Sequence, residues 1–209
     1  MENLANNAQK RTVNTNAKTG GLSLFNLLLA AILISIGQVL KVTISALLAS
    51  ATGGLIKPNF VIAMYCLVVL LIRPKFFEAL IIGVFAGAVN QFMPAVPFIN
   101  FGSEVVGALV MCLLVAIPLG RKIAAANDAA APQKNTLSTV GDYLLKPVIG
   151  TFLATLASGF SFVGLQYLVL KEMPENYIYI FMSVIFITAA LNAAIVAILY
   201  PPLKRVLKK

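Results

Sequence analysis

The strongest constraint on this chain is a series of apolar segments that are long enough, or nearly long enough, to cross a lipid bilayer. Six can be distinguished: Leu22 to Leu40, Pro58 to Ile72, Phe77 to Phe92, Phe98 to Leu119, Val148 to Leu170 and Ile178 to Tyr200. A helix needs about 20 residues to cross ~30 Å of hydrocarbon, so the second segment is barely sufficient. Hydrophobic residues make up 60% of the chain and charged residues 11%, which excludes an ordinary soluble domain. The sequence therefore predicts an all-α membrane protein, a compact bundle of six transmembrane helices.

The basic residues predict how these spans are oriented. Thirteen of the sixteen Lys and Arg residues precede the first span, join spans two and three, join spans four and five, or follow span six. The other connections hold only Lys57 and Lys171, and Lys41 lies at the end of the first span. Cytoplasmic segments carry an excess of basic residues. Both termini are therefore predicted to be cytoplasmic.

The same reading divides the chain into a tail and one domain. Residues 1–21 are polar and rich in asparagine, which predicts a disordered cytoplasmic tail. Residues 22–209 are predicted to form the six-helix transmembrane domain. Its cytoplasmic linker, at about 120–146, is rich in alanine and of low complexity around 124–131.

Several classes of function are excluded by what the sequence does not contain. There is no histidine, there are two cysteines, and no G-x-x-x-x-G-K-[ST] motif occurs. Histidine-based triads, histidine metal sites and a nucleotide-hydrolysing loop therefore cannot be assembled. The formal net charge of +9 would favour nucleic acid in a soluble protein, but here the charges flank apolar segments. We therefore expect that the chain is not an enzyme and that it has no metal, no cofactor and no nucleic-acid partner.

Polar residues inside the spans concentrate toward the predicted outer side of the membrane. The inner half of the bundle is much poorer in them, an asymmetry that favours a cup open to the outside over a conduction path. We take the residues of this outer zone as candidates for binding a small-molecule substrate; they are Gln38, Lys41, Asn90, Gln91, Asn100, Glu104, Gln166, Tyr167 and Tyr179.

Glu104 is the most informative of these candidates. A charged side chain at the centre of a membrane helix costs roughly 2.5–3.5 kcal/mol on insertion scales, so Glu104 should face the bundle and have a partner. That partner is either Lys41 or an ammonium group of the ligand. Lys41 has a second interpretation, because a lysine near a helix end can extend its ammonium to the membrane interface. Tyr179 likewise fits an aromatic belt at the interface as well as a binding site.

Two further features point to motion and to contacts between helices. Gly53 and Gly54 lie in a predicted external loop, where they suit a lid over the cup, although a plain turn is the more common meaning of Gly-Gly. Small residues recur every four positions in most spans, and such stripes let helices approach closely, either inside the chain or against another membrane subunit. The stripes are Ala31-x-x-x-Ser35, Ala79-x-x-x-Gly83-x-x-x-Gly87, Gly150-x-x-x-Ala154-x-x-x-Ser158 and Ala189-x-x-x-Ala193-x-x-x-Ala197.

Four short motifs, taken in order, resemble a known family. They are Lys57-Pro58-Asn59, Ile72-Arg73-Pro74, Phe98-Ile99-Asn100-Phe101, and Leu191-Asn192 followed eight residues later by Tyr200-Pro201. Together they resemble the tryptophan transporter (TrpP) family over Ala31 to Leu207. That family is similar to the substrate-binding S components of energy-coupling factor (ECF) transporters.

The resemblance implies a six-helix subunit that binds tryptophan or a related small aromatic nutrient from outside. It also implies partners, namely a transmembrane T component and two ATPase subunits, with Ala31 and Ser35 in the position of the Ala-x-x-x-Ala docking surface. The alternative is a self-contained secondary transporter of a small amino acid or vitamin. Such a transporter would be expected to show inverted repeats and interrupted helices, and no convincing internal repeat is visible.

Overall fold

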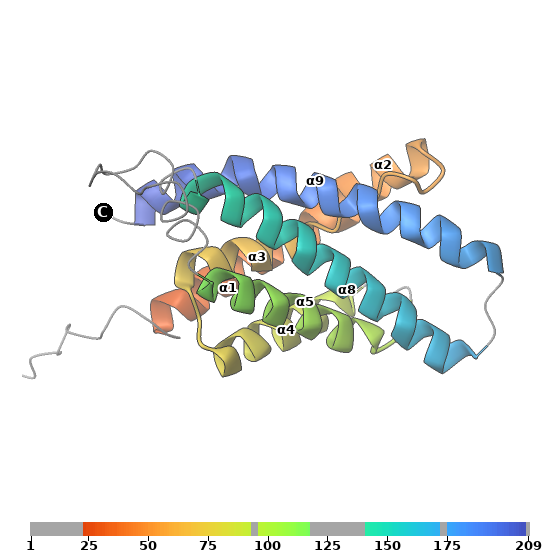
Figure 1. Ribbon diagram of the computed structural model, residues 1–209, viewed down its shortest axis with the longest axis horizontal. Helices are drawn as coiled ribbons and strands as arrows, with labels where there is room; N and C mark the ends of the chain where they lie inside the picture. Colours follow the sequence, from red (N-terminus) through yellow and green to blue (C-terminus); the bar gives the residue numbers. More distant parts are fainter. Residues whose placement is uncertain (1–22, 93–95, 118–140, 172–174, 208–209) are drawn as a thin grey trace, which may run out of the picture.

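The computed structural model describes residues 23–92, 96–117, 141–171 and 175–207, and every regular element in these ranges is a helix (Figure 1). The elements are α1 (Leu24–Leu40), the π-helical η1 (Lys41–Ser45), α2 (Ala46–Ala51), α3 (Phe60–Ile72), α4 (Phe76–Asn90), α5 (Ile99–Ala116), the π-helical η2 (Gly141–Leu145), α8 (Lys146–Leu170) and α9 (Glu175–Leu207). The all-α prediction is therefore confirmed.

Each predicted span coincides with a helix, but the first and last helices are longer than predicted. The first does not end beside Lys41 and instead continues to Ala51, forming 28 residues with η1 and α2. Part of the predicted linker, from Gly141 to Lys146, is helical and leads into α8. The predicted tail and the rest of the linker, 120–140, lie outside the described residues.

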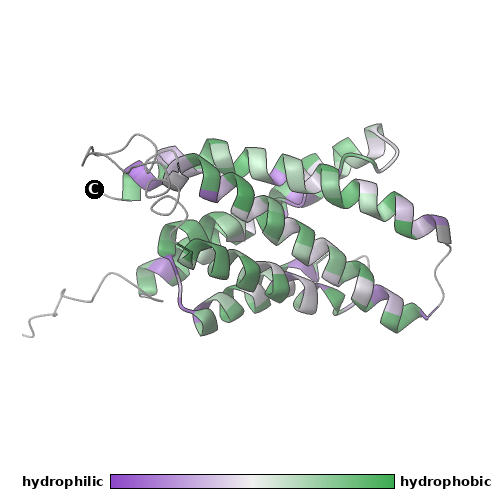
Figure 2. Ribbon diagram, in the orientation of Figure 1, coloured by the Kyte–Doolittle hydropathy of each residue, from purple (hydrophilic) through white to green (hydrophobic). Residues whose placement is uncertain are grey.

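Four of the described helices are long and apolar enough to cross a membrane. They are Leu24–Ala51, Ile99–Ala116, Tyr143–Leu170 and Asn176–Leu207. The apolar helices α3 and α4 are shorter. Hydrophobic residues cover most of the length of the helices (Figure 2). The chain is therefore a multi-pass membrane protein.

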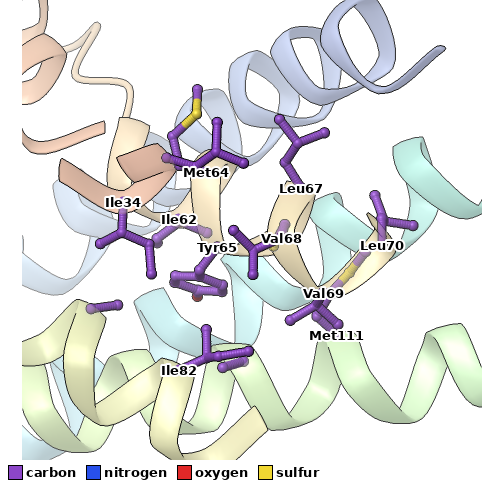
Figure 3. Packing of buried hydrophobic residues seen from close by; sticks show 14 of the residues in the cluster. Ile34, Ile62, Met64, Tyr65, Leu67, Val68, Val69, Leu70, Ile82 and Met111 are labelled. Carbon is purple, nitrogen blue, oxygen red and sulfur yellow. The ribbon is translucent and has the colours of Figure 1, made fainter. Parts of the chain in front are cut away.

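Helix α3 lies at the centre of the bundle. Every residue of α3 except Leu71 is buried, and the helix packs against α1, α4, α5, α8 and α9. Its Tyr65 ring lies among aliphatic side chains that include Ile34, Ile62 and Val68 (Figure 3). A helix that is apolar on all sides is one that is buried on all sides. The composition of Pro58 to Ile72 therefore reflects protein neighbours around the whole helix.

Small residues make close helix contacts possible inside the chain. A Cβ atom on Gly87 of α4 would lie 2.8 Å from Phe101 Cα of α5, and one on Gly83 would lie 2.7 Å from Val105 Cα. The stripe on α8 is buried at Gly150, Ala154 and Ser158, and a Cβ on Gly107 of α5 would meet its Ala154 carbonyl at 3.2 Å. The Ala31/Ser35 stripe differs, because Ala31 is half-buried and Ser35 is exposed.

Candidate functional site

A cavity of about 530 Å³ lies between the helices. The surrounding residues come from η1, from the segment before α3, and from α3, α5, α8 and α9. They are Lys41, Ser45, Lys57, Pro58, Asn59, Ile62, Asn100, Ser103, Glu104, Thr155, Ser158, Gly159, Phe162, Phe181, Val184, Ile185 and Thr188. Lys41, Asn100 and Glu104 are thus the predicted site residues that line it.

The Glu104 carboxyl group is almost fully buried and is surrounded by neutral donors. Asn90 Nδ2 donates to Glu104 Oε1 at 2.6 Å, and Asn59 Nδ2 reaches the same oxygen at 3.4 Å. Ser158 Oγ donates to Oε2 at 3.2 Å. These donors come from the end of α4, the residue before α3, and α8. A buried carboxyl group needs such partners, and here three separate elements supply them.

Lys41 faces into the bundle. Its Nζ donates to Asn90 Oδ1 at 2.7 Å. The ammonium therefore points toward Asn90 and does not extend to the membrane interface. Within the part of the chain that the structure describes, Lys41 and Glu104 form no direct ion pair. Instead, the two ends of the Asn90 side-chain amide contact one charged group each. The predicted Lys41–Glu104 partnership therefore exists only through Asn90.

A π-helical turn places Lys41 in this position. The turn covers Lys41 to Ser45, and both of these residues line the cavity. A π turn places an extra residue within an otherwise α-helical run, and such turns are frequent at functional sites. The apolar run ending at Leu40 gave no sign of this turn, so the sequence alone placed Lys41 at the end of a span.

The segment before α3 is non-helical and borders the cavity. Lys57, Pro58 and Asn59 all line it, and Thr188 Oγ1 of α9 donates to the Lys57 carbonyl oxygen at 3.0 Å. This segment is therefore part of the cavity wall, although in the sequence it is notable only as a motif that resembles a known family.

The two glycines predicted to form a lid form a turn at the end of α2. Gly53 and Gly54 have φ angles of 61° and 88°, and the Gly54 N–H donates to the Ala49 carbonyl at 2.7 Å. Positive φ favours glycine. Neither glycine lines the cavity, whereas Lys57, three residues after Gly54, does.

Two phenylalanine rings form an aromatic wall on the α8/α9 side of the cavity. The rings of Phe162 and Phe181 are nearly parallel, with an interplanar angle of 9° and centroids 6.2 Å apart. The Tyr177 ring extends this group, with its centroid 4.6 Å from that of Phe181. The cavity thus combines polar groups around Lys41 and Glu104 with an aromatic surface from α8 and α9.

Six of the predicted site residues do not line the cavity. Asn90 is fully buried and reaches the site through its contacts with Lys41, Glu104 and Asn100. Gln91 accepts a hydrogen bond from the Phe98 N–H at 3.2 Å and so connects α4 to α5. The others are Gln38, which is buried, Gln166, which exchanges hydrogen bonds with the Tyr177 hydroxyl, and Tyr167 and Tyr179, which are 53% and 75% exposed.

Sequence reasoning missed several polar residues of the cavity. The sequence argument grouped residues by their expected depth in the membrane and did not consider the direction that each side chain takes around its helix. Their spacing along one helix could have identified the residues on α8. Thr155, Ser158 and Phe162 follow one another at three- and four-residue spacing on α8, which places them on one face of that helix.

Comparison with known proteins supports one family. The family model described as "Tryptophan transporter TrpP" matches residues 23–208. This range includes all the residues that line the cavity. No curated protein and no solved structure matches the chain.

Proposed function

The chain belongs to the tryptophan transporter TrpP family, and we propose that it is the membrane substrate-binding subunit of an uptake system for tryptophan or a related small aromatic nutrient. In this proposal it works as an S component of an ECF-type transporter. One observation carries the proposal, namely the cavity, whose wall combines charged and polar side chains with the rings of Phe162 and Phe181. Ligand pockets of ~300–1,000 Å³ typically combine apolar walls with a few placed polar groups.

The proposal includes six membrane crossings with both termini in the cytoplasm. Helices α3 and α4 join the four long helices as crossings, and the turn at Arg73, Pro74 and Lys75 connects them on the cytoplasmic side. The burial of α3 supports this arrangement, because a helix covered by protein need not match the bilayer thickness along its own length. The alternating excess of Lys and Arg supports the orientation.

Separate subunits supply the energy in this proposal. The sequence contains no nucleotide-binding loop, so a T component and two ATPase subunits drive release of substrate to the inside. The docking surface is the Ala31/Ser35 stripe of α1. Support comes from its exposure, because other small-residue stripes are occupied by contacts within the chain whereas Ser35 is exposed. The loop that contains Gly53 and Gly54 acts as the lid, moving the adjacent segment at Lys57 to Asn59.

Binding and transport measurements on the purified chain test this function. In detergent, isothermal titration with tryptophan should show saturable binding at one site per chain. In liposomes, the chain alone should bind tryptophan without accumulating it, and accumulation should require the T component, the ATPase subunits and ATP. Accumulation by the chain alone under an ion gradient would instead establish a secondary transporter. Absence of tryptophan binding by the folded chain would refute the substrate assignment.

A further inference from the structure

The cavity holds two opposite charges that the fold keeps separate. Lys41 and Glu104 both line it, and Asn90 lies between them with its amide oxygen on Lys41 and its amide nitrogen on Glu104. Asn90 is 0% exposed, so it supports both groups from behind the cavity wall. Direct contact between the two charges would neutralise them within the protein, and the intervening amide prevents this contact in the structure.

Each charged group retains capacity for a further hydrogen bond. A lysine ammonium has three donors, and among the described residues Lys41 Nζ donates only to Asn90. A carboxylate offers about four lone-pair sites, of which Asn90, Asn59 and Ser158 occupy three. Asn59 also has a buried Oδ1 with no partner among the described residues. The cavity thus presents unused donors at Lys41 and unused acceptors beside Glu104.

The spacing suits the two charged ends of an α-amino acid. An amide separates its oxygen and nitrogen by about 2.2 Å, given its bond lengths, and the ammonium nitrogen and nearest carboxylate oxygen of an α-amino acid lie about 2.7 Å apart. The groups that contact the two ends of the Asn90 amide are therefore spaced to contact the two ends of an amino acid as well. Ordered charge pairs of this kind give strong and directional hydrogen bonds.

We infer that this cavity selects a zwitterionic α-amino acid, with its carboxylate at the Lys41 ammonium and its ammonium at Glu104 and Asn59 Oδ1. The inference rests on the proposed function and deepens it by naming the charged groups that the substrate must carry. The aromatic side chain then lies toward Phe162 and Phe181. Asn90 is a positioning residue, because it acts by holding Lys41 and Glu104 apart.

Substrate analogues test the inference on the unmodified protein. Tryptophan, tryptamine and indole-3-propionate share the indole ring, but tryptamine lacks the carboxylate and indole-3-propionate lacks the ammonium. Calorimetric titration of the full chain should give a Kd at least tenfold weaker for each analogue than for tryptophan. Equal affinity for tryptophan and either analogue would overturn the inference and leave the proposed function standing. Lack of tryptophan binding would refute the proposed function itself.

Variants then assign each charged end to its protein partner. In Lys41→Met the preference for tryptophan over tryptamine should disappear, while the preference over indole-3-propionate remains. In Glu104→Gln the preference over indole-3-propionate should disappear, while the preference over tryptamine remains. Lys171→Met is the control and should keep both preferences, because Lys171 is exposed, follows the last residue of α8 and does not line the cavity. Lys57 does line the cavity, so Lys57→Met tests it as the alternative partner of the carboxylate. Loss of the carboxylate preference in Lys57→Met, with Lys41→Met unchanged, would overturn the assignment. Because the variants are compared by ratios of affinities, a general loss of folded protein does not imitate either pattern.

Discussion

Lys41 Nζ lies 2.7 Å from Asn90 Oδ1, a contact between residues 49 positions apart that joins the π-helical turn after α1 to the last residue of α4. The contact fixes the orientation of the Asn90 amide, because its oxygen faces the ammonium and its nitrogen then faces Glu104 at 2.6 Å. Two charged groups from different helices thereby acquire neutral partners. Asn90 is consequently the residue on which the polar side of the cavity depends most.

Replacing Asn90 by leucine should destabilise the chain strongly. Leucine has the same branching and number of side-chain heavy atoms, although it is bulkier, and it has no hydrogen-bonding group, so Lys41 and Glu104 would each lose a partner. Leaving a buried polar group unsatisfied costs about 1–3 kcal/mol, and more for a charged group. We expect Asn90→Leu to lower the free energy of unfolding by about 2–4 kcal/mol, measured by thermal unfolding of the purified chain in detergent.

Asn192→Leu is the matched control for this prediction. Asn192 is also fully buried, but its Nδ2 makes one long hydrogen bond to Thr155 Oγ1, at 3.4 Å, and its Oδ1 has no partner among the described residues. Little is lost when such a group is replaced by an apolar one. We expect a change below about 1 kcal/mol, and an equal loss in both variants would contradict the special role of Asn90.

The aromatic wall should contribute to affinity for an aromatic ligand. Phe181→Leu keeps an apolar side chain but removes a ring that lines the cavity. Aromatic pairs contribute about 0.5–1.5 kcal/mol beyond their buried area, so tryptophan should bind roughly 2- to 10-fold more weakly in a titration. Phe186→Leu is the control, because Phe186 contacts Phe152 and Phe160 rather than the cavity. A larger loss in Phe186→Leu would show that the ring acts through packing.

The sequence predicted the number and positions of the helices well because hydrophobicity along the chain determines them directly. It predicted the residues that line the cavity less well. Glu104, Asn100 and Lys41 were found because a polar group in an apolar helix is costly, and such groups face inward. Gln91 and Gln166 satisfy the same argument, yet they make hydrogen bonds to the Phe98 N–H and the Tyr177 hydroxyl. Composition cannot distinguish a ligand-facing amide from one that joins two helices, since both are buried polar groups.

The close contact between α4 and α5 should be sensitive to one added methyl group. A Cβ on Gly87 would lie 2.8 Å from Phe101 Cα and 3.1 Å from the Asn100 carbonyl oxygen, so backbone atoms would have to move. Overpacking of this kind costs about 1–3 kcal/mol. Gly87→Ala should therefore lower the unfolding temperature in detergent. Gly164→Ala, also in a helix, meets no atom within 4 Å and should be neutral or stabilising, because alanine favours helix over glycine.

The orientation proposed for the bundle rests on the distribution of Lys and Arg and can be tested independently of binding. Alkaline phosphatase and green fluorescent protein fused after Lys209 should give low phosphatase activity and high fluorescence in cells, as expected for a cytoplasmic terminus. A phosphatase fusion within the loop that holds Gly53 and Gly54 should be active. An inactive fusion in that loop, or an active one after Lys209, would contradict the six-crossing topology.

Bulky residues on the exposed stripe of α1 should separate binding from transport. Ser35 is exposed and Ala31 is half-buried. A tryptophan side chain introduced at either position should project from the bundle. It should keep a partner helix at a distance, because close approach depends on small side chains. Neither residue lines the cavity, so binding of the nutrient in detergent should persist while uptake by cells fails. Ile36→Trp is the control, because Ile36 is exposed on the same helix but lies on a different face and should leave uptake intact. Normal uptake by both the Ala31→Trp and the Ser35→Trp variants would show that this stripe is not the docking surface. Loss of ligand binding in either variant would show that the substitution disturbs the fold and not the contact with a partner.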